Sequence, residues 1–146
     1  GNHDEVLSYA AAITLEQKFG DLENVTFDTS AGPENKRKYN QYGVNLVGLE
    51  HGEKTGRRIE TIMQDEQPEL WGATKFREWH LAHEHSEQLK SVGRLKIRRV
   101  GSITAIDDWH GGKGFRARRE ANAFLWNKDS GLSNILYSNV EVDKPV

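Results

Sequence analysis

Apolar residues recur at helical spacing near the start of the chain, in the segment EVLSYAAAITLEQKFG. The apolar positions of this segment are Val6, Leu7, Ala10, Ala11, Ile13 (or Ala12) and Phe19. A repeat of this kind is typical of a helix that turns one face toward a core. Asp4 can cap the first turn of such a helix, and Gly20 can end the last one. The pattern therefore predicts one helix between these two residues.

Two short stretches of alternating polarity follow this helix. The segments NVTFDTS (24–30) and YGVNLVGLEH (42–51) place apolar and polar residues in turn, which is typical of strands. The second strand is expected to end at His51. The polar segment SAGPENKRKYNQ between the two strands predicts a turn or loop.

The middle of the chain changes back to a helical pattern and then to strands. In RRIETIMQDEQPELWG, Ile59, Ile62 and Met63 share one helical face, and Pro68 closes or kinks the helix. FREWHLAHEH predicts a strand that runs into a histidine-rich end. RLKIRRVGSIT predicts a further strand, and IDDWHGGKGF a glycine-rich loop.

The last part of the chain carries a hairpin pattern. EANAFLWNKDSGLSNILYSNVEV contains two alternating runs around the turn sequence DSG. No internal repeat, low-complexity segment or linker divides the chain, so we expect a single domain over residues 1–146. The order of the elements predicts an α/β fold with a mixed sheet and a strand-rich C-terminal part.

The composition excludes several kinds of site. The chain has 146 residues and no cysteine, which excludes disulfides, thiolate metal sites and cysteine nucleophiles. No apolar run is long enough to span a bilayer, and no signal peptide is visible. We therefore expect a cytoplasmic protein without a membrane partner, in which His, Asp, Glu or Asn side chains hold any metal ion.

Charge is distributed unevenly along the chain. Residues 1–75 hold 8 Lys and Arg against 13 Asp and Glu, whereas residues 76–146 hold 12 against 9. Nine of the 12 Lys and Arg of residues 76–146 lie between Lys90 and Arg119. A basic surface near a hydrolytic site attracts phosphate-bearing substrates, nucleic acid among them. Solvated strand faces explain the same charges without a ligand, and composition alone favours that explanation.

Three of the six histidines lie in the short segment WHLAHEH. On an extended backbone, His83 and His85 would point to the same side of the strand, where two imidazoles can ligate metal. His51, at the end of an apolar strand, lies where parallel sheets usually place functional groups. Each histidine can equally be a structural residue whose hydrogen bonds are satisfied within the fold.

Taken together, these short motifs resemble those of the calcineurin-like metallophosphoesterase family, whose later motifs follow the order GNH(D/E), HG and GHxH. The corresponding residues are Gly1-Asn2-His3-Asp4, His51-Gly52 and Ala82-His83-Glu84-His85. The segment GSITAIDDWHGGKGFRARREANAFLWNKDSGL is similar to the closing segment of a phage and bacterial branch of these enzymes. The resemblance covers nearly all of the chain. It implies an α/β metallophosphoesterase sandwich, of which we expect this chain to carry the C-terminal half.

Two features depart from the family pattern. Ala82 stands where the family has a glycine, which is compatible with the motif only if the backbone φ is negative there. The first two motifs of the family, DxH and GDxxD, are absent, and with them the carboxylate that bridges two metal ions. We therefore expect a metal-dependent phosphoesterase, acting on phosphomonoesters or phosphodiesters, that is impaired as this chain alone.

The resemblance also implies a role for each residue of the motifs. Asn2, His51 and His83 would ligate one divalent cation. His85 would belong to a second cation, and His3 would stabilise the transition state or protonate the leaving oxygen. Nitrogen and oxygen ligands without sulfur suit Mn²⁺, which we expect here, and also Fe or Zn²⁺. With the bridging carboxylate missing, we predict a single weak metal site at most.

Three more polar residues are candidates for supporting roles. Asp4 orients neighbouring groups or, as the position favours, caps its helix. His80 is one strand position out of phase with His83, and either donates a hydrogen bond to the site or is simply packed. His110 follows Trp109 in the glycine-rich loop, a position open to substrate.

Two other functions fit the same sequence. A catalytically inactive fragment would expose apolar sheet and helix surface and would assemble as a homo-oligomer. A small nucleic-acid-binding module would use the basic strands together with Trp109, Phe115 and Trp126, because aromatic rings between basic residues can stack on bases. The alternation in AFLWN, however, places Phe124 and Trp126 on one face, where burial in a core is the simpler explanation.

Overall fold

A computed structural model describes residues 5–29, 37–53, 58–103 and 119–139 of the chain. The chain divides into two compact units, which comprise residues 1–38 and 39–146. No helix within the described ranges is long and apolar enough to cross a membrane. The second unit contains the sheet and all the described histidines, so it decides where a site can form.

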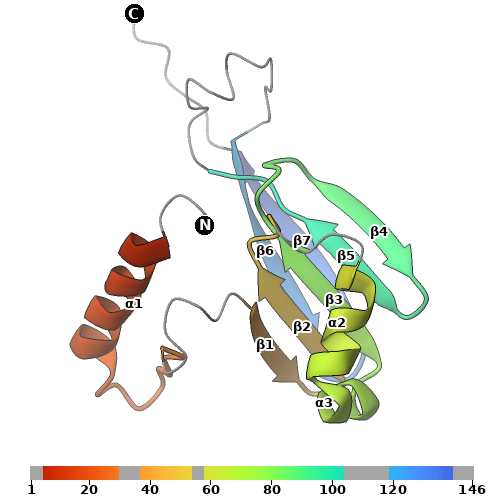
Figure 1. Ribbon diagram of the computed structural model, residues 1–146, viewed down its shortest axis with the longest axis horizontal. Coiled ribbons are helices and arrows are strands. Elements are labelled where there is room, and N and C mark those ends of the chain that lie inside the picture. Colours follow the sequence, from red (N-terminus) through yellow and green to blue (C-terminus); the bar gives the residue numbers. More distant parts are fainter. Residues whose placement is uncertain (1–4, 30–36, 54–57, 104–118, 140–146) are drawn as a thin grey trace, which may run out of the picture. The chain divides into compact units, whose positions relative to one another are not determined.

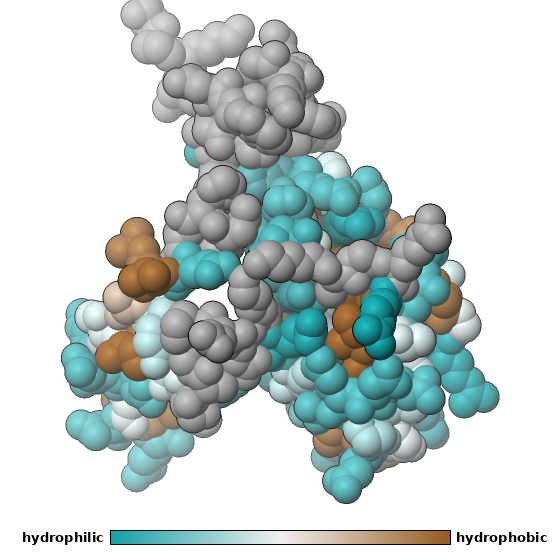
Figure 2. Space-filling view, in the orientation of Figure 1, coloured by the Kyte–Doolittle hydropathy of each residue, from teal (hydrophilic) through white to brown (hydrophobic). Residues whose placement is uncertain are grey.

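The first unit is built around the helix α1, Glu5–Phe19 (Figure 1). Gly20 ends the helix as predicted, and its N–H donates a hydrogen bond to the carbonyl oxygen of Glu16 at 2.7 Å. None of the residues of α1 is buried, and Val6 and Leu7 are 79% and 72% exposed. Figure 2 shows apolar atoms at the surface of this helix. The predicted helix is therefore confirmed, whereas its apolar positions do not mark a buried face of this unit.

The second unit is organised by a five-stranded sheet in the order β1-β2-β3-β5-β4. Its strands are β1 (Arg37–Tyr42), β2 (Asn45–Glu50), β3 (Phe76–Leu81), β4 (Gln88–Val92) and β5 (Leu95–Arg99). The pairs β2–β3 and β3–β5 are parallel, whereas β4 and β5 are antiparallel. The predicted mixed α/β fold is therefore confirmed.

Two short helices, α2 (Ile59–Glu66) and α3 (Pro68–Ala73), supply the core on one face of this sheet. Pro68 closes the first helix as predicted and starts the second, a position where its missing N–H costs nothing. Trp79 of β3 is fully buried and donates a hydrogen bond from Nε1 to the carbonyl oxygen of Ile59 at 3.1 Å. The other buried apolar residues of the core are Leu46, Ile59, Met63, Leu81, Leu95 and Ile97.

A hairpin of the strands β6 (Glu120–Asn127) and β7 (Gly131–Asn139) contacts the other face of the sheet. Asn45, buried on β2, donates a hydrogen bond to the carbonyl oxygen of Asn127 at 2.9 Å. The ring of Phe124 lies 4.3 Å from that of His80 on β3. The predicted hairpin is thus confirmed, and its Phe124 packs against a sheet face that carries polar side chains.

The structure corrects the predicted elements in three places. Residues 24–29 contain no strand, although their polarity alternates. The predicted loop 30–41 includes most of β1, whose Tyr39 lies with its ring 5.4 Å from that of Trp79. The strand β4 was missed, because its residues are exposed or half-buried at an edge and carry no alternating pattern. Pairing with a neighbouring strand, which local polarity does not encode, decides β1 and β4.

Candidate functional site

The two parallel strands β2 and β3 end side by side, and this brings two predicted metal ligands together. Glu50, the last residue of β2, is in register with Leu81, the last residue of β3. His51 follows directly, and its carbonyl oxygen accepts a hydrogen bond from the N–H of Ala82 at 3.0 Å. The carboxyl ends of parallel strands are where such sheets place their functional groups. His51 and the residues after Ala82 therefore lie next to each other at the carboxyl ends of β2 and β3.

The imidazoles of His51 and His83 contact each other at this edge of the sheet. Nδ1 of His83 lies 3.2 Å from Nε2 of His51, and the ring centroids are 5.0 Å apart in an edge-to-face arrangement. One of the two nitrogens carries the proton of this hydrogen bond, and the other accepts it. Residues separated by 32 positions thus bring two ring nitrogens into contact.

The backbone after β3 turns sharply, and this turn directs His83 toward His51. Among the described residues other than glycine, only His83 and His85 have positive φ, 51° in each case. The N–H of Glu84 donates to the carbonyl oxygen of Ala82 at 2.6 Å, which closes a three-residue turn around His83. The prediction that His83 and His85 lie on an extended backbone was therefore wrong. Ala82 does not have positive φ, as the replacement of the family glycine requires.

Backbone and side-chain contacts hold this turn in place. The Oε1 atom of Glu84 lies 3.1 Å from Nε of Arg99, the last residue of β5. The N–H of Val100 donates to the carbonyl oxygen of Leu81 at 2.8 Å. On the other side, Gly52 adopts a φ of 104°, which favours glycine after His51. A left-handed residue that is not glycine costs energy and persists only when its surroundings impose it, so the turn at His83 marks a candidate functional position.

The spacing of the two nitrogens fits a shared metal ion. Imidazole nitrogens lie about 2.1 Å from a bound zinc ion, so two of them 3.2 Å apart subtend an angle of roughly 100° at the metal. That angle lies between those of octahedral and tetrahedral coordination. Within the described ranges, however, no group of three His, Cys, Asp or Glu side chains is placed to hold a metal ion. Of the predicted ligands, the described residues bring together His51 and His83, a pair that we call the half-site, and do not add His85 as a third.

Four of the other predicted site residues cannot be compared with this geometry. Asn2, His3 and Asp4 lie outside the described residues, and so does His110. The role of Asn2 as the third ligand and that of His3 in leaving-group protonation therefore stay predictions.

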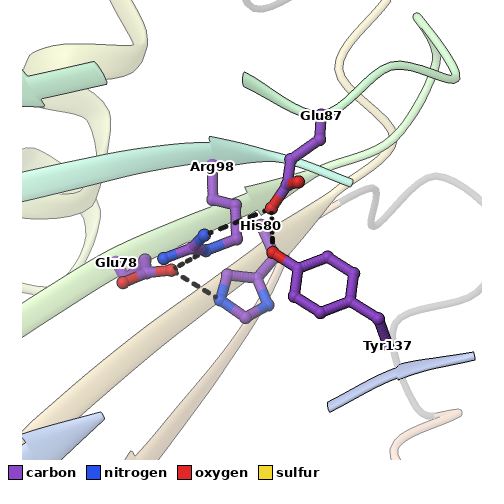
Figure 3. A network of polar contacts seen from close by, with 5 residues as sticks. All are labelled: Glu78, His80, Glu87, Arg98 and Tyr137. Atoms are coloured by element: carbon purple, nitrogen blue, oxygen red, sulfur yellow. Dashed lines mark hydrogen bonds and ion pairs between the residues drawn. The ribbon is translucent and has the colours of Figure 1, made fainter. Parts of the chain in front are cut away.

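His80 belongs to a different cluster, on the sheet face that contacts the hairpin. Its Nε2 lies 3.1 Å from Oε1 of Glu78, and the same oxygen accepts a hydrogen bond from Nε of Arg98 at 2.5 Å. Figure 3 shows how Glu87 and Tyr137 continue this network. The hydroxyl of Tyr137 donates to Oε1 of Glu87 at 2.7 Å, and Glu87 also lies 3.8 Å from Nη1 of Arg98. We call these five residues the Glu78 network.

The Glu78 network keeps a carboxylate charged inside the fold. The side chains of Glu78, His80 and Arg98 are only 3%, 11% and 6% exposed. Burial raises the pKa of Glu78, but the hydrogen bonds and charges of His80 and Arg98 oppose it and bring the pKa below its ordinary value. Buried charges are tolerated when they are paired in this way. His80 is thus packed and hydrogen-bonded between sheet and hairpin.

Sequence reasoning missed Glu78, Arg98 and Glu84, although each has a detectable signal. Glu78 and Arg98 are charged residues that adjoin buried apolar ones in short strands, Trp79 in β3 and Ile97 in β5. Alternation across a strand places Glu78 and His80 on the same face, so their contact could have been predicted. The partner of Glu84 could not, because Arg99 reaches it only through the pairing of β3 with β5.

Comparisons with known proteins find similar proteins among the solved structures. No protein-family model matches the chain, and no curated protein matches it either. Two solved structures are similar, the crystal structures of a single mutant and a double mutant of Vps29 from Entamoeba histolytica. The single mutant is 15% identical with a TM-score of 0.44, and the double mutant is 17% identical with a TM-score of 0.45. The matches cover 73% and 80% of this chain, and 62% and 67% of the two Vps29 chains.

Proposed function

We propose that this chain forms part of a metal-dependent phosphoesterase of the calcineurin-like family, from the phage and bacterial branch, and acts in the cytoplasm. The contact between His51 and His83 carries the proposal. These residues belong to two separate motifs, HG and the HxH of AHEH, and their ring nitrogens lie 3.2 Å apart at the end of two parallel strands.

His51 and His83 would each give one nitrogen to the same divalent cation, with Mn²⁺ expected and Fe or Zn²⁺ as alternatives. The cation, when bound, would supply Lewis-acid polarisation of a phosphoryl oxygen. The chain itself contributes orientation. The backbone hydrogen bond from Ala82 to His51 and the ion pair between Glu84 and Arg99 orient the two imidazoles toward each other before a ligand binds. As the resemblance implies, Asn2 would be the third ligand of this cation, and His3 would stabilise the transition state or protonate the leaving oxygen. His85 would belong to a second cation.

Metal binding and hydrolysis test the proposal together. The purified chain is titrated with Mn²⁺, the bound ions are counted, and hydrolysis of bis-p-nitrophenyl phosphate is measured with and without the metal. We expect at most one weakly bound ion per chain and slow, metal-dependent hydrolysis. His51→Ala and His83→Ala should each abolish Mn²⁺ binding, because only one imidazole of the half-site would remain.

His80→Gln is the matched control, since it removes an imidazole from β3 but keeps a hydrogen-bond donor for Glu78. It should bind Mn²⁺ as the unchanged chain does. Circular dichroism of every variant confirms that the fold is kept. Equal Mn²⁺ binding by His83→Ala and the unchanged chain would refute the half-site, and two tightly bound ions per chain would refute the single weak site.

A further inference from the structure

A cavity of about 520 Å³ lies at the end of the sheet opposite the histidine pair. Lys75 and Phe76, at the start of β3, line it together with Arg94 and Lys96 from the β4–β5 turn and the start of β5. His51 and His83 instead follow the last residues of β2 and β3. The six residues of β3 span roughly 17 Å at about 3.3 Å per residue, so the cavity is a separate site. Its volume falls in the range of small-molecule sites, about 300–1,000 Å³.

The charges that line this cavity favour an anion. Among the described residues that line it, the basic ones are Lys75, Arg77, Arg94 and Lys96, and the acidic one is Glu78. The carboxylate of Glu78 already accepts hydrogen bonds from His80 and Arg98, so it does not neutralise the basic residues. A concave surface lined by charges of one sign concentrates ligands of the opposite sign.

Three of these cations have their charged groups available. Arg77 is committed, because its guanidinium donates to the carbonyl oxygens of Trp71 and Thr74. Burial lowers the pKa of Arg77, and repulsion by the charge of Arg94 adds a smaller effect in the same direction. Lys75, Arg94 and Lys96 are exposed and make no side-chain hydrogen bond or ion pair within the part of the chain that the structure describes. A phosphate group would relieve this repulsion and take up their donors.

Aromatic rings line the same cavity beside these cations. Phe76 is 42% exposed, and Trp126 of the hairpin lies on the same lining. Gly131 approaches Phe76 so closely that a side chain there would begin 3.0 Å from the ring. Glycine at this position therefore leaves the ring of Phe76 in place. Aromatic faces next to cations suit a ligand that joins a planar ring to a phosphate.

We propose that this cavity binds a small phosphorylated ligand of the size of a nucleoside monophosphate. Lys75, Arg94 and Lys96 hold the phosphate, and Trp126 and Phe76 contact the ring. The site needs no metal ion and is separate from the histidine pair. It therefore stands independently of the phosphoesterase proposal.

Isothermal titration of the whole chain with AMP, in EDTA, tests the proposal. Ribose 5-phosphate and inorganic phosphate are titrated alongside, because they carry the phosphate without the planar base. We expect AMP to bind about tenfold more tightly than ribose 5-phosphate, since stacking on aromatic side chains contributes this much or more. The variant His51→Ala/His83→Ala should bind AMP unchanged, which separates this site from the metal half-site.

Charge and stacking are then removed separately. Arg94→Ala/Lys96→Ala should weaken AMP and ribose 5-phosphate at least tenfold, whereas Trp126→Leu should remove only the preference for AMP. Lys18→Ala/Lys90→Ala removes the same charge outside the lining and should change neither. Circular dichroism checks that each variant folds.

Three results would overturn the proposal. They are no AMP binding at millimolar concentration, unchanged binding by Arg94→Ala/Lys96→Ala, and equal affinities for AMP and ribose 5-phosphate. If the chain fails to bind AMP but binds a single-stranded oligonucleotide, the first of these results favours an extended nucleic-acid surface instead.

Discussion

Replacing Glu78 by glutamine should destabilise the second unit through the loss of one buried charge. The oxygen of Glu78 accepts one bond from His80 at 3.1 Å and one from Arg98 at 2.5 Å. Bonds to a charged group contribute about 1.5–3 kcal/mol each and are roughly twice as strong as neutral ones. Glutamine keeps an acceptor, so it loses about half of each bond, which amounts to about 2 kcal/mol. Arg98 also loses its nearest counter-charge, so we expect a total of about 3 kcal/mol.

Urea unfolding measures this loss, and an exposed ion pair supplies the comparison. Glu60 lies 2.5 Å from Nζ of Lys90, at the same distance as Glu78 from Arg98. Its side chain is 34% exposed, however, against 3% for Glu78. Exposed pairs contribute about 0–1 kcal/mol, so Glu60→Gln should change the unfolding midpoint little. If both substitutions cost the same, burial does not set the strength of the Glu78 network and the reasoning fails.

The effect of Glu78→Gln should also depend on pH. The pKa of Glu78 is lower in the folded chain than its ordinary value of 4.5. A group of this kind stabilises the fold above its unfolded pKa, and the stabilisation disappears as the pH falls through the folded pKa. The difference in unfolding free energy between the two chains should therefore be largest near pH 7 and shrink below about pH 4.5. A difference that stays constant down to pH 3 would show that Glu78 is not the titrating group.

Two further substitutions test packing and the end of the network. Gly48→Ala places a methyl group 2.5 Å from the ring of Trp79 and 2.8 Å from Met63. Urea unfolding should therefore show a loss of about 1–3 kcal/mol in the free energy of unfolding. The control Gly72→Ala, whose methyl group meets nothing within 4 Å, should show no such loss. The hydrogen bond to Glu87 raises the pKa of the Tyr137 hydroxyl, so Glu87→Gln should lower the pH at which this tyrosine ionises in an ultraviolet titration. An unchanged titration curve would contradict that contact.

Much of the secondary structure could be predicted because it depends on neighbours along the chain. The period of α1, the alternation of β2 and the turn sequence of the hairpin each appear within a short window. The strand β1 could not be predicted in this way, since its Tyr39 is positioned by the ring of Trp79, 40 residues further on. The backbone conformation at His83 could not be predicted either, because nothing in the segment His83-Glu84-His85 indicates a positive φ.

The sequence by itself determined the candidate chemistry and the local elements. The absence of cysteine excluded thiolate sites, and the histidine motifs indicated His51 and His83 as candidate ligands of one metal ion. Only the tertiary structure decided that these imidazoles lie 3.2 Å apart, and that Glu78 and Arg98 form a buried pair under the hairpin. The physical reason is the parallel pairing of β2, β3 and β5. It brings together residues far apart in the chain, and no local preference specifies which strands become neighbours.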